Sequence, residues 1–389
     1  MRGHIEQRGP SSFRLKVYVG RDPITGKERS VTKTVRGSKR DAETALGKLI
    51  GEVGDGRVTS GAGTTGELVE RWFGVASVDW SPKTRENVRS WIDLYVLPQL
   101  GQVPLRRLSA VEIDRFYARL RTAGVSGRPL SPASVHRIHN VVHRALGQGV
   151  KWGMLARNVA DDATPPKRRP TQLRPPSLDE ARALIARAEE RDPVFAAFLR
   201  LAATTGARRS ELLGLTWADV GLDDDAADVV VRRAVIATSD GLVTKATKTD
   251  RERRVALAPA TVATLRRLRA AVRSQALAIG IGAKGLEGAY VFAEPPWEVP
   301  WHPDSVSTHF ARLRRSVGVS GVRLHDLRHL AATQMLSRGV DVRTVSGRLG
   351  HARPSMTLDV YGHFLPAADR DAARVMDDAL DVATTRPRR

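Results

Sequence analysis

The residues of this chain that are best suited to chemistry are arginines, histidines, a lysine and a tyrosine. Residues 325–329 read His-Asp-Leu-Arg-His, residues 350–351 read Gly-His, and Tyr361 follows ten residues later. Upstream, Arg208 follows a Thr-Gly-Ala segment, and Lys248 lies between two threonines. Guanidinium groups hold phosphate oxygens, and a phenol can attack phosphorus. This set therefore predicts cleavage of a phosphodiester bond without a metal ion.

The order of these residues carries a family resemblance. Arg, Lys, His-x-x-Arg, Gly-His and Tyr follow one another as in the tyrosine recombinases, the integrase class of DNA strand-exchange enzymes. The chain resembles this family over roughly residues 175–365, with weaker likeness towards both ends. The resemblance implies an α+β multidomain fold. It would comprise a small N-terminal β-sheet with one helix, an all-α helical bundle, and a mainly helical catalytic domain with a small antiparallel sheet.

Tyr361 matches the nucleophile of the family. A phenol has an ordinary pKa of about 10 and needs help to lose its proton, but the phosphotyrosine that it forms keeps the bond energy for rejoining. The chain has five tyrosines. Tyr290, the other one after residue 175, lies in a Tyr-Val-Phe segment typical of a buried strand. The alternative for Tyr361 is a structural tyrosine in a helix.

Two arginines match the phosphate-binding pair of the family. Arg208 and Arg328 would hold the two non-bridging oxygens, because guanidinium forks fit phosphate and stay charged throughout the reaction. Glu211 is placed to orient Arg208. Arg209 is the competing candidate, but the Thr-Gly-x-Arg pattern of the family selects Arg208, and we expect Arg209 on the surface.

The remaining catalytic candidates handle protons and hydrogen bonds. Lys248 would protonate the departing 5′ oxygen from a β-turn, with Lys245 as its near rival. His325 would take or relay the tyrosine proton, and His351 would donate a hydrogen bond to the phosphate. We expect His329 to be a packing residue behind the site.

Composition predicts a polyanionic partner. The formal net charge is +21 and the pI is near 11.1, a surplus that repels itself unless it neutralises phosphate. Double-stranded DNA is the expected partner, although a codon bias towards arginine would also raise the pI. The absence of cysteine excludes disulfide frameworks, thiolate zinc sites and cysteine nucleophiles. No stretch approaches the roughly 20 apolar residues of a membrane span, so we expect no membrane partner and a cytoplasmic, nucleoid-associated protein.

Residues 1–60 are expected to form an arm-type DNA-binding domain. Residues 13–19 alternate apolar and polar side chains with the period of a half-buried strand, and a second strand through residues 31–35 leads to a helix start at residues 38–41. This basic sheet with one helix resembles the arm-site domain of long integrases. Arg14, Lys16 and Lys33 are its candidate DNA contacts. The alternative is a solvated basic hairpin.

Residues 64–164 are expected to form four helices, which resemble the core-binding domain that lies over one face of the duplex. Residues 165–176 are rich in proline and basic side chains and should be extended. Lys167, Arg168 and Arg169 are candidate DNA contacts in this basic linker. A solvated linker without DNA contacts is the alternative.

Residues 177–389 are expected to form the catalytic domain with a C-terminal tail. Strands are predicted at residues 229–236, 242–244 and 254–257, within otherwise helical sequence. In the family, a C-terminal segment docks onto a neighbouring subunit. Residues 367–382, with apolar side chains at helical spacing, could be that segment.

A zinc site is a rival reading of residues 325–329. They place two histidines one helical turn apart with an acid second, as in metalloproteases. That motif uses glutamate rather than aspartate as the base, and it leaves the charge surplus and Arg208 without a role. Metal analysis of the purified protein separates the two readings.

Two further hypotheses also have DNA as the partner. A non-catalytic site-specific DNA-binding regulator would use the same charge and N-terminal modules, and a type IB topoisomerase uses a similar site for strand relaxation. The arm-like N-terminus favours recombination, with no cofactor. Because each active site cuts one strand, exchange between two duplexes requires a homotetramer on DNA. A host DNA-bending protein or an excision factor could act with it.

Overall fold

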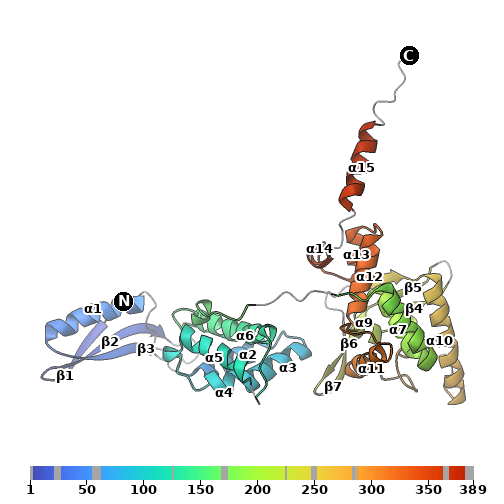
Figure 1. The fold of residues 1–389 in the computed structure, drawn as a ribbon. Coiled ribbons are helices and arrows are strands. Elements are labelled where there is room, and N and C mark those ends of the chain that lie inside the picture. The colour runs from blue at the N-terminus through green and yellow to red at the C-terminus, as the bar shows by residue number, and fades with distance from the viewer. Residues whose placement is uncertain are drawn as a thin grey trace. The chain divides into compact units, whose positions relative to one another are not determined.

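The computed structural model describes residues 3–21, 28–54, 63–124, 127–167, 174–223, 226–246, 252–282, 286, 288–361 and 368–381. The chain divides into two compact units, Met1–Pro170 and Thr171–Arg389. Each unit combines helices with small antiparallel sheets, which confirms the predicted α+β multidomain class (Figure 1). None of the helices in the described ranges is long and apolar enough to cross a membrane.

The chain opens with a three-stranded antiparallel sheet covered on one face by a helix. β1 (Gly3–Gly9), β2 (Ser12–Arg21) and β3 (Glu28–Arg36) lie in that order, and α1 (Lys39–Gly54) packs against them. The helix begins where Ser38 and Asp41 bond to each other through side chain and backbone. Its apolar residues meet the alternating apolar residues of the sheet in one small core, which contains Phe13, Leu15, Val17, Val31, Ala42, Leu49 and Val53.

The register of this sheet places the three candidate DNA-contacting residues on two different faces. Arg14 and Lys16 flank the buried Leu15 and are exposed, so they project from the face turned away from α1. Lys33 pairs directly opposite Leu15 and is therefore on the other face, where it is exposed. The open face of the sheet thus carries Arg14 and Lys16 but not Lys33.

A helical bundle forms the second hydrophobic core of the first unit. α2 (Thr65–Ala76) begins with a capping box between Thr64 and Glu67, and serines cap α3 (Pro82–Trp91), α5 (Ala110–Thr122) and α6 (Pro132–Lys151). α3 continues through a π-helical segment, η1 (Ile92–Val96), into α4 (Leu97–Leu100). The bundle also contains two short 3-10 helices, η2 (Leu105–Arg107) and η3 (Val159–Asp161). Trp72 and Phe116 are buried in this core, so they are packing residues.

The second unit is mainly helical. Its longer helices are α7 (Leu178–Arg191), α8 (Pro193–Thr205), α10 (Pro259–Ala278), α11 (Pro303–Ser316), α12 (Asp326–Ser337) and α15 (Ala368–Asp381). Its shorter helices are α9 (Arg209–Leu213), η4 (Trp217–Asp219), α13 (Val342–Leu349) and α14 (Ser355–Tyr361). One large core is built around phenylalanines of α8 and α11. A smaller core joins α12, α13 and Tyr361, which brings the C-terminal chemical residues to one place.

The strands of the second unit form two small antiparallel sheets. β4 (Val220–Gly221), β5 (Asp228–Val231) and β8 (Arg253–Ala256) lie in the order β4-β5-β8, and β6 (Arg233–Thr238) pairs with β7 (Gly241–Ala246). The prediction of one strand over residues 229–236 is therefore wrong. The strand breaks at Arg232, whose side chain forms ion pairs with Asp219 and Glu252.

Two other sequence expectations have clear outcomes. The segment at Tyr290 forms isolated bridges rather than a strand ladder, and prolines that cannot donate ladder bonds follow it at residues 295, 296 and 300. The helix expected within residues 367–382 is present as α15. Its apolar residues Val375, Met376 and Leu380 are exposed.

Candidate active site

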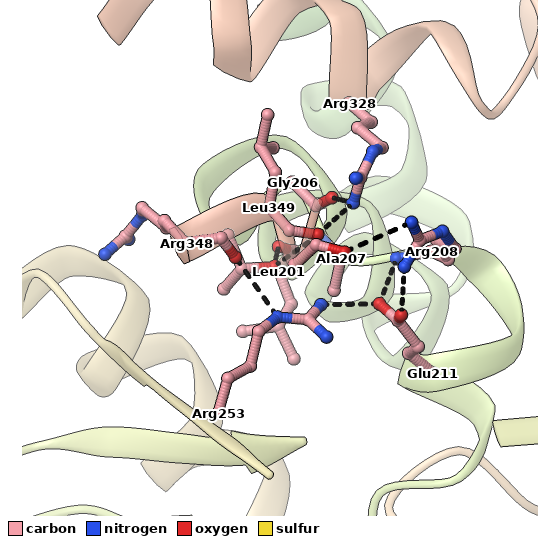
Figure 2. A network of polar contacts seen from close by, with 11 residues as sticks. Leu201, Gly206, Ala207, Arg208, Glu211, Arg253, Arg328, Arg348 and Leu349 are labelled. Carbon is pink, nitrogen blue, oxygen red and sulfur yellow. Dashed lines mark hydrogen bonds and ion pairs between the residues drawn. The ribbon is translucent and has the colours of Figure 1, made fainter. Parts of the chain in front are cut away.

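Arg328 is the buried centre of the site. Its side chain projects from α12 and is only 3% exposed. Nη1 donates to the carbonyl oxygens of Gly206 at 2.7 Å and Leu349 at 2.6 Å, whereas Nη2 is buried without a partner in the described part of the chain (Figure 2). Burial and the nearby Arg208 lower the pKa of Arg328 to about 10, so the guanidinium remains charged at neutral pH.

Two left-handed glycines let the carbonyls reach Arg328. Gly206 ends α8 with φ +66°, and Gly350 ends α13 with φ +70°. A Cβ at Gly206 would lie 2.4 Å from Leu349 Cδ2, and one at Gly350 would lie 2.9 Å from Arg253 Nη1. Both helix ends therefore favour glycine for their left-handed backbone conformation.

Arg208 is held by a buried carboxylate. Glu211, 3% exposed, accepts from Arg208 Nη1 at 2.6 Å, from the Arg208 backbone N–H at 2.8 Å and from Arg253 Nη2 at 2.5 Å (Figure 2). Burial alone would raise the pKa of Glu211, but the hydrogen bonds and charges of these arginines outweigh it and lower the pKa. The carboxylate is thus ionised and fixes the guanidinium of Arg208, which is 33% exposed.

Arg253 ties strand β8 to the rest of the site. Besides its bond to Glu211, its Nε donates to the carbonyl oxygen of Arg348 at 3.2 Å, two residues before Gly350. We did not predict this role from the sequence. The available signal is the two-residue period of the strand, because Arg253 alternates with the exposed Arg254 and shares a face with the buried Val255.

The register of β8 agrees with this period. In the pairing with β5, Arg253 lies opposite Val231 and Val255 opposite Val229, and both valines are buried. Arg253 is therefore the basic residue of β8 that faces inward, whereas Arg254 pairs with Asp228 at 2.9 Å on the exposed side.

The two predicted histidines flank the arginines. His351 follows Gly350, and its Nδ1 lies 2.8 Å from Thr357 Oγ1, which in turn lies 2.6 Å from Ser346 Oγ. His325 occupies the N-cap position of α12, with its ring 5.2 Å from that of His329. Burial and neighbouring positive groups lower the pKa of both His325 and His351 to about 4, so both are neutral at pH 7.

Tyr361 ends α14 inside the smaller core of the unit. Its side chain is 1% exposed, and its Oη lies 2.6 Å from Nδ1 of His329. Burial raises the pKa of Tyr361, opposed by the charge of Arg328. No hydrogen bond joins Tyr361 to His325 within the described ranges. His329, expected to pack or to support the reacting groups from behind, is the group that contacts the phenol oxygen.

Other sequence candidates lie elsewhere or outside the described residues. Lys248 falls within residues 247–251, between β7 and β8, and Arg168 and Arg169 fall within residues 168–173, so their positions are not described. Lys167 is exposed. Arg209 is 35% exposed, and its Nη1 donates to the Pro303 carbonyl oxygen of α11 at 2.7 Å and contacts Ser307.

Two family models match the chain. Residues 177–367 match the phage integrase family, and residues 64–121 match the phage integrase N-terminal SAM-like domain. The ICEBs1 integrase of Bacillus subtilis is 25% identical over 373 residues, which are 95% of this chain and 97% of that protein. A tyrosine recombinase XerC-like protein of Caldanaerobacter subterraneus is 26% identical over 391 residues, covering 96% of this chain and 97% of that protein.

Solved integrase structures share the fold. The Tn1549 transposon integrase in complex with a circular intermediate DNA has a TM-score of 0.66 over 82% of this chain and 100% of that chain, at 16% identity. A lambda integrase tetramer bound to a Holliday junction gives a TM-score of 0.55 over 90% of this chain and 96% of that chain, at 19% identity. The chain belongs to the phage integrase family of tyrosine-type, site-specific DNA recombinases, which are DNA strand transferases.

Proposed function

We propose that the protein cuts and rejoins DNA through a 3′-phosphotyrosine on Tyr361, with Arg208 and Arg328 holding the phosphate. The observation that carries this proposal is Arg328 Nη2, a buried donor without an acceptor in the described part of the chain. Leaving such a donor unpaired costs about 1–3 kcal/mol, and a non-bridging phosphate oxygen would satisfy it. Arg208, held by Glu211 and partly exposed, would bind the other oxygen.

The covalent steps follow from this set of groups. Tyr361 Oη attacks phosphorus, the bond from phosphorus to the 5′ oxygen breaks, and Lys248 protonates the departing oxygen. The arginines balance the negative charge of the phosphorane, so we assign no metal or cofactor to the step. The free 5′ hydroxyl of a partner strand then attacks the phosphotyrosine and gives its proton to Lys248, and Tyr361 leaves and regains its own proton.

The histidines supply hydrogen bonds to the same phosphate. If Thr357 donates to His351 Nδ1 and Ser346 donates to Thr357, the Nε2–H of His351 is free to donate to a phosphate oxygen. His325 stays in the assignment as a relay, because its ring lies 5.2 Å from that of His329. A zinc site has no further support, since the described residues hold no cluster of three or more potential ligands.

We assign the two units to a DNA clamp. Residues 1–60 would bind arm sites, and residues 64–164 would bind the core site. Residues 165–176 would follow the DNA backbone, with Lys167, Arg168 and Arg169 as contacts. Residues 177–389 would carry out catalysis. Related integrases have been captured on a circular intermediate DNA and as a tetramer on a Holliday junction. The +21 charge supports the same partner here.

Strand exchange requires a homotetramer, since each active site cuts one strand. The exposed apolar side chains of α15 suit docking onto a neighbouring subunit. The protein would act in the cytoplasm on the nucleoid, at attachment sites, and a host DNA-bending protein or an excision factor could assist it.

The sheet register gives a point-mutation test of the arm assignment. Replacing Arg14 and Lys16 by alanine should lower the slope of log affinity against log salt on long DNA by roughly one for each lost phosphate contact. Deleting residues 1–60 should lower it further and impair integration on long substrates, while cleavage of a short core-site duplex persists. Lys33→Ala, which removes a charge from the opposite face, is the matched control. Normal integration and an unchanged slope after the deletion would rule out a DNA-binding arm.

Mapping covalent protein–DNA junctions in cells tests the recombinase function. We expect 3′-linked adducts at a few defined sites, together with joined products in which strands have exchanged partners. Adducts with relaxation but no exchange would favour a topoisomerase. Occupied sites without adducts would favour a DNA-binding regulator.

A further inference from the structure

The hydroxyl of Tyr361, the proposed nucleophile, lies within hydrogen-bond distance of the ring of His329. Oη lies 2.6 Å from Nδ1, and the two rings are 5.6 Å apart at an interplanar angle of 56°. The apolar side chains of Ala332, Leu336, Val345 and Leu349 surround the tyrosine and fix its ring. A buried hydroxyl needs a hydrogen-bond partner, so a purely structural contact is the competing explanation.

The imidazole of His329 is in the right state to accept a proton. Burial lowers the pKa of His329, so the ring is neutral at pH 7 and one of its nitrogens has a free lone pair. When Nδ1 is the unprotonated nitrogen, the phenol O–H of Tyr361 can donate a hydrogen bond to it. The charged groups that act on the ring are Asp326, which favours the imidazolium, and Arg323 and Arg328, which oppose it.

The phosphate would change this balance in favour of proton transfer. Arg328 is the neighbour of His329 in α12, and its free Nη2 marks where a phosphate oxygen would bind. The negative charge that develops on the phosphorane would stabilise an imidazolium beside it, in a site where burial strengthens electrostatic interactions. His325 lacks this position, because it has no hydrogen bond to Tyr361 in the described residues.

We propose that His329 is the catalytic base for Tyr361, and this assignment rests on the proposed function above. As Oη attacks phosphorus, the phenol proton moves to Nδ1 of His329, while the electron pair of the breaking bond goes to the 5′ oxygen. In the rejoining step the bond from Oη to phosphorus breaks, and His329 returns the proton to Tyr361. No oxidant, metal or further reactant enters the balance.

Paired asparagine variants test this assignment by single-turnover cleavage of a core-site duplex. Asparagine at position 329 can keep a hydrogen bond to Tyr361 but cannot take its proton, so His329→Asn should slow covalent-complex formation by about 100-fold or more. Replacing Tyr361 by a ring-fluorinated tyrosine, whose phenol is more acidic, should restore most of that loss. The same replacement should leave the defect of His325→Asn in place.

The controls separate a base from a packing residue. His302→Asn should cleave normally, because His302 is an exposed N-cap of α11 and asparagine caps equally well. DNA affinity and thermal unfolding of each variant report folding. Fluorotyrosine rescue of His325→Asn but not of His329→Asn would overturn the proposal, even if His329→Asn folds poorly, and so would wild-type cleavage by His329→Asn. If Tyr361→Phe still forms adducts, the nucleophile assignment fails instead.

Discussion

Tyr361→Phe should abolish the covalent protein–DNA complex while leaving DNA affinity intact, because only the attacking oxygen is lost. The variant also removes the partner of His329 Nδ1, a part-buried nitrogen, which would lower the free energy of unfolding by about 1 kcal/mol. Cleavage is measured as a denaturant-resistant adduct on a nicked core-site duplex that traps the intermediate.

Tyr290→Phe is the matched control for this prediction. Its hydroxyl lies 3.3 Å from Thr244 Oγ1 of β7, so its loss should leave adduct formation unchanged. An adduct that survives Tyr361→Phe and disappears with Tyr290→Phe would transfer the nucleophile to the other tyrosine.

Lys248→Ala should lose about 100- to 10,000-fold in cleavage of normal DNA, because the 5′ alkoxide is a poor leaving group without an acid. A sulfur at the bridging 5′ position departs without protonation, so the same variant should recover cleavage on the sulfur-substituted strand. Arg208→Ala should not recover, since its role is to hold phosphate charge. Both rates are measured on matched oxygen and sulfur duplexes.

Lys245→Ala distinguishes the two lysine candidates. Lys245 lies in β7 opposite Ala234, within a regular strand pair. The Lys245→Ala variant should cleave both the oxygen and the sulfur duplex at the rate of the unmodified protein. Sulfur rescue of Lys245→Ala instead of Lys248→Ala would exchange their roles, and equal rescue of Lys248→Ala and Arg208→Ala would remove the acid assignment.

The local parts of the site could be predicted from the sequence because they depend on short patterns. Gly206 before Arg208 and Gly350 before His351 each set a left-handed turn from the local sequence. In the structure, Arg328 donates to the carbonyl oxygens of Gly206 and Leu349 at these two turns. The helix starts of the bundle were equally local, since each has its own capping residue.

What could not be predicted depends on packing between distant segments. His329 and Tyr361 are 32 residues apart, and their contact exists only because α12 and α14 share the smaller core. The same is true of Arg209, whose hydrogen bond to the Pro303 carbonyl oxygen joins residues 94 positions apart. The face of Lys33 is a local property instead, because the two-residue period of β3 places Lys33 with Val31 and Val35, and the register agrees.

The most direct test of the central claim is to identify the residue that carries DNA. After cleavage of a trapping duplex, the adduct is digested with protease and nuclease and the modified peptide is sequenced by mass spectrometry. We expect a single nucleotide attached through its 3′ phosphate to Tyr361. Attachment to any other residue, or through a 5′ phosphate, would contradict the account.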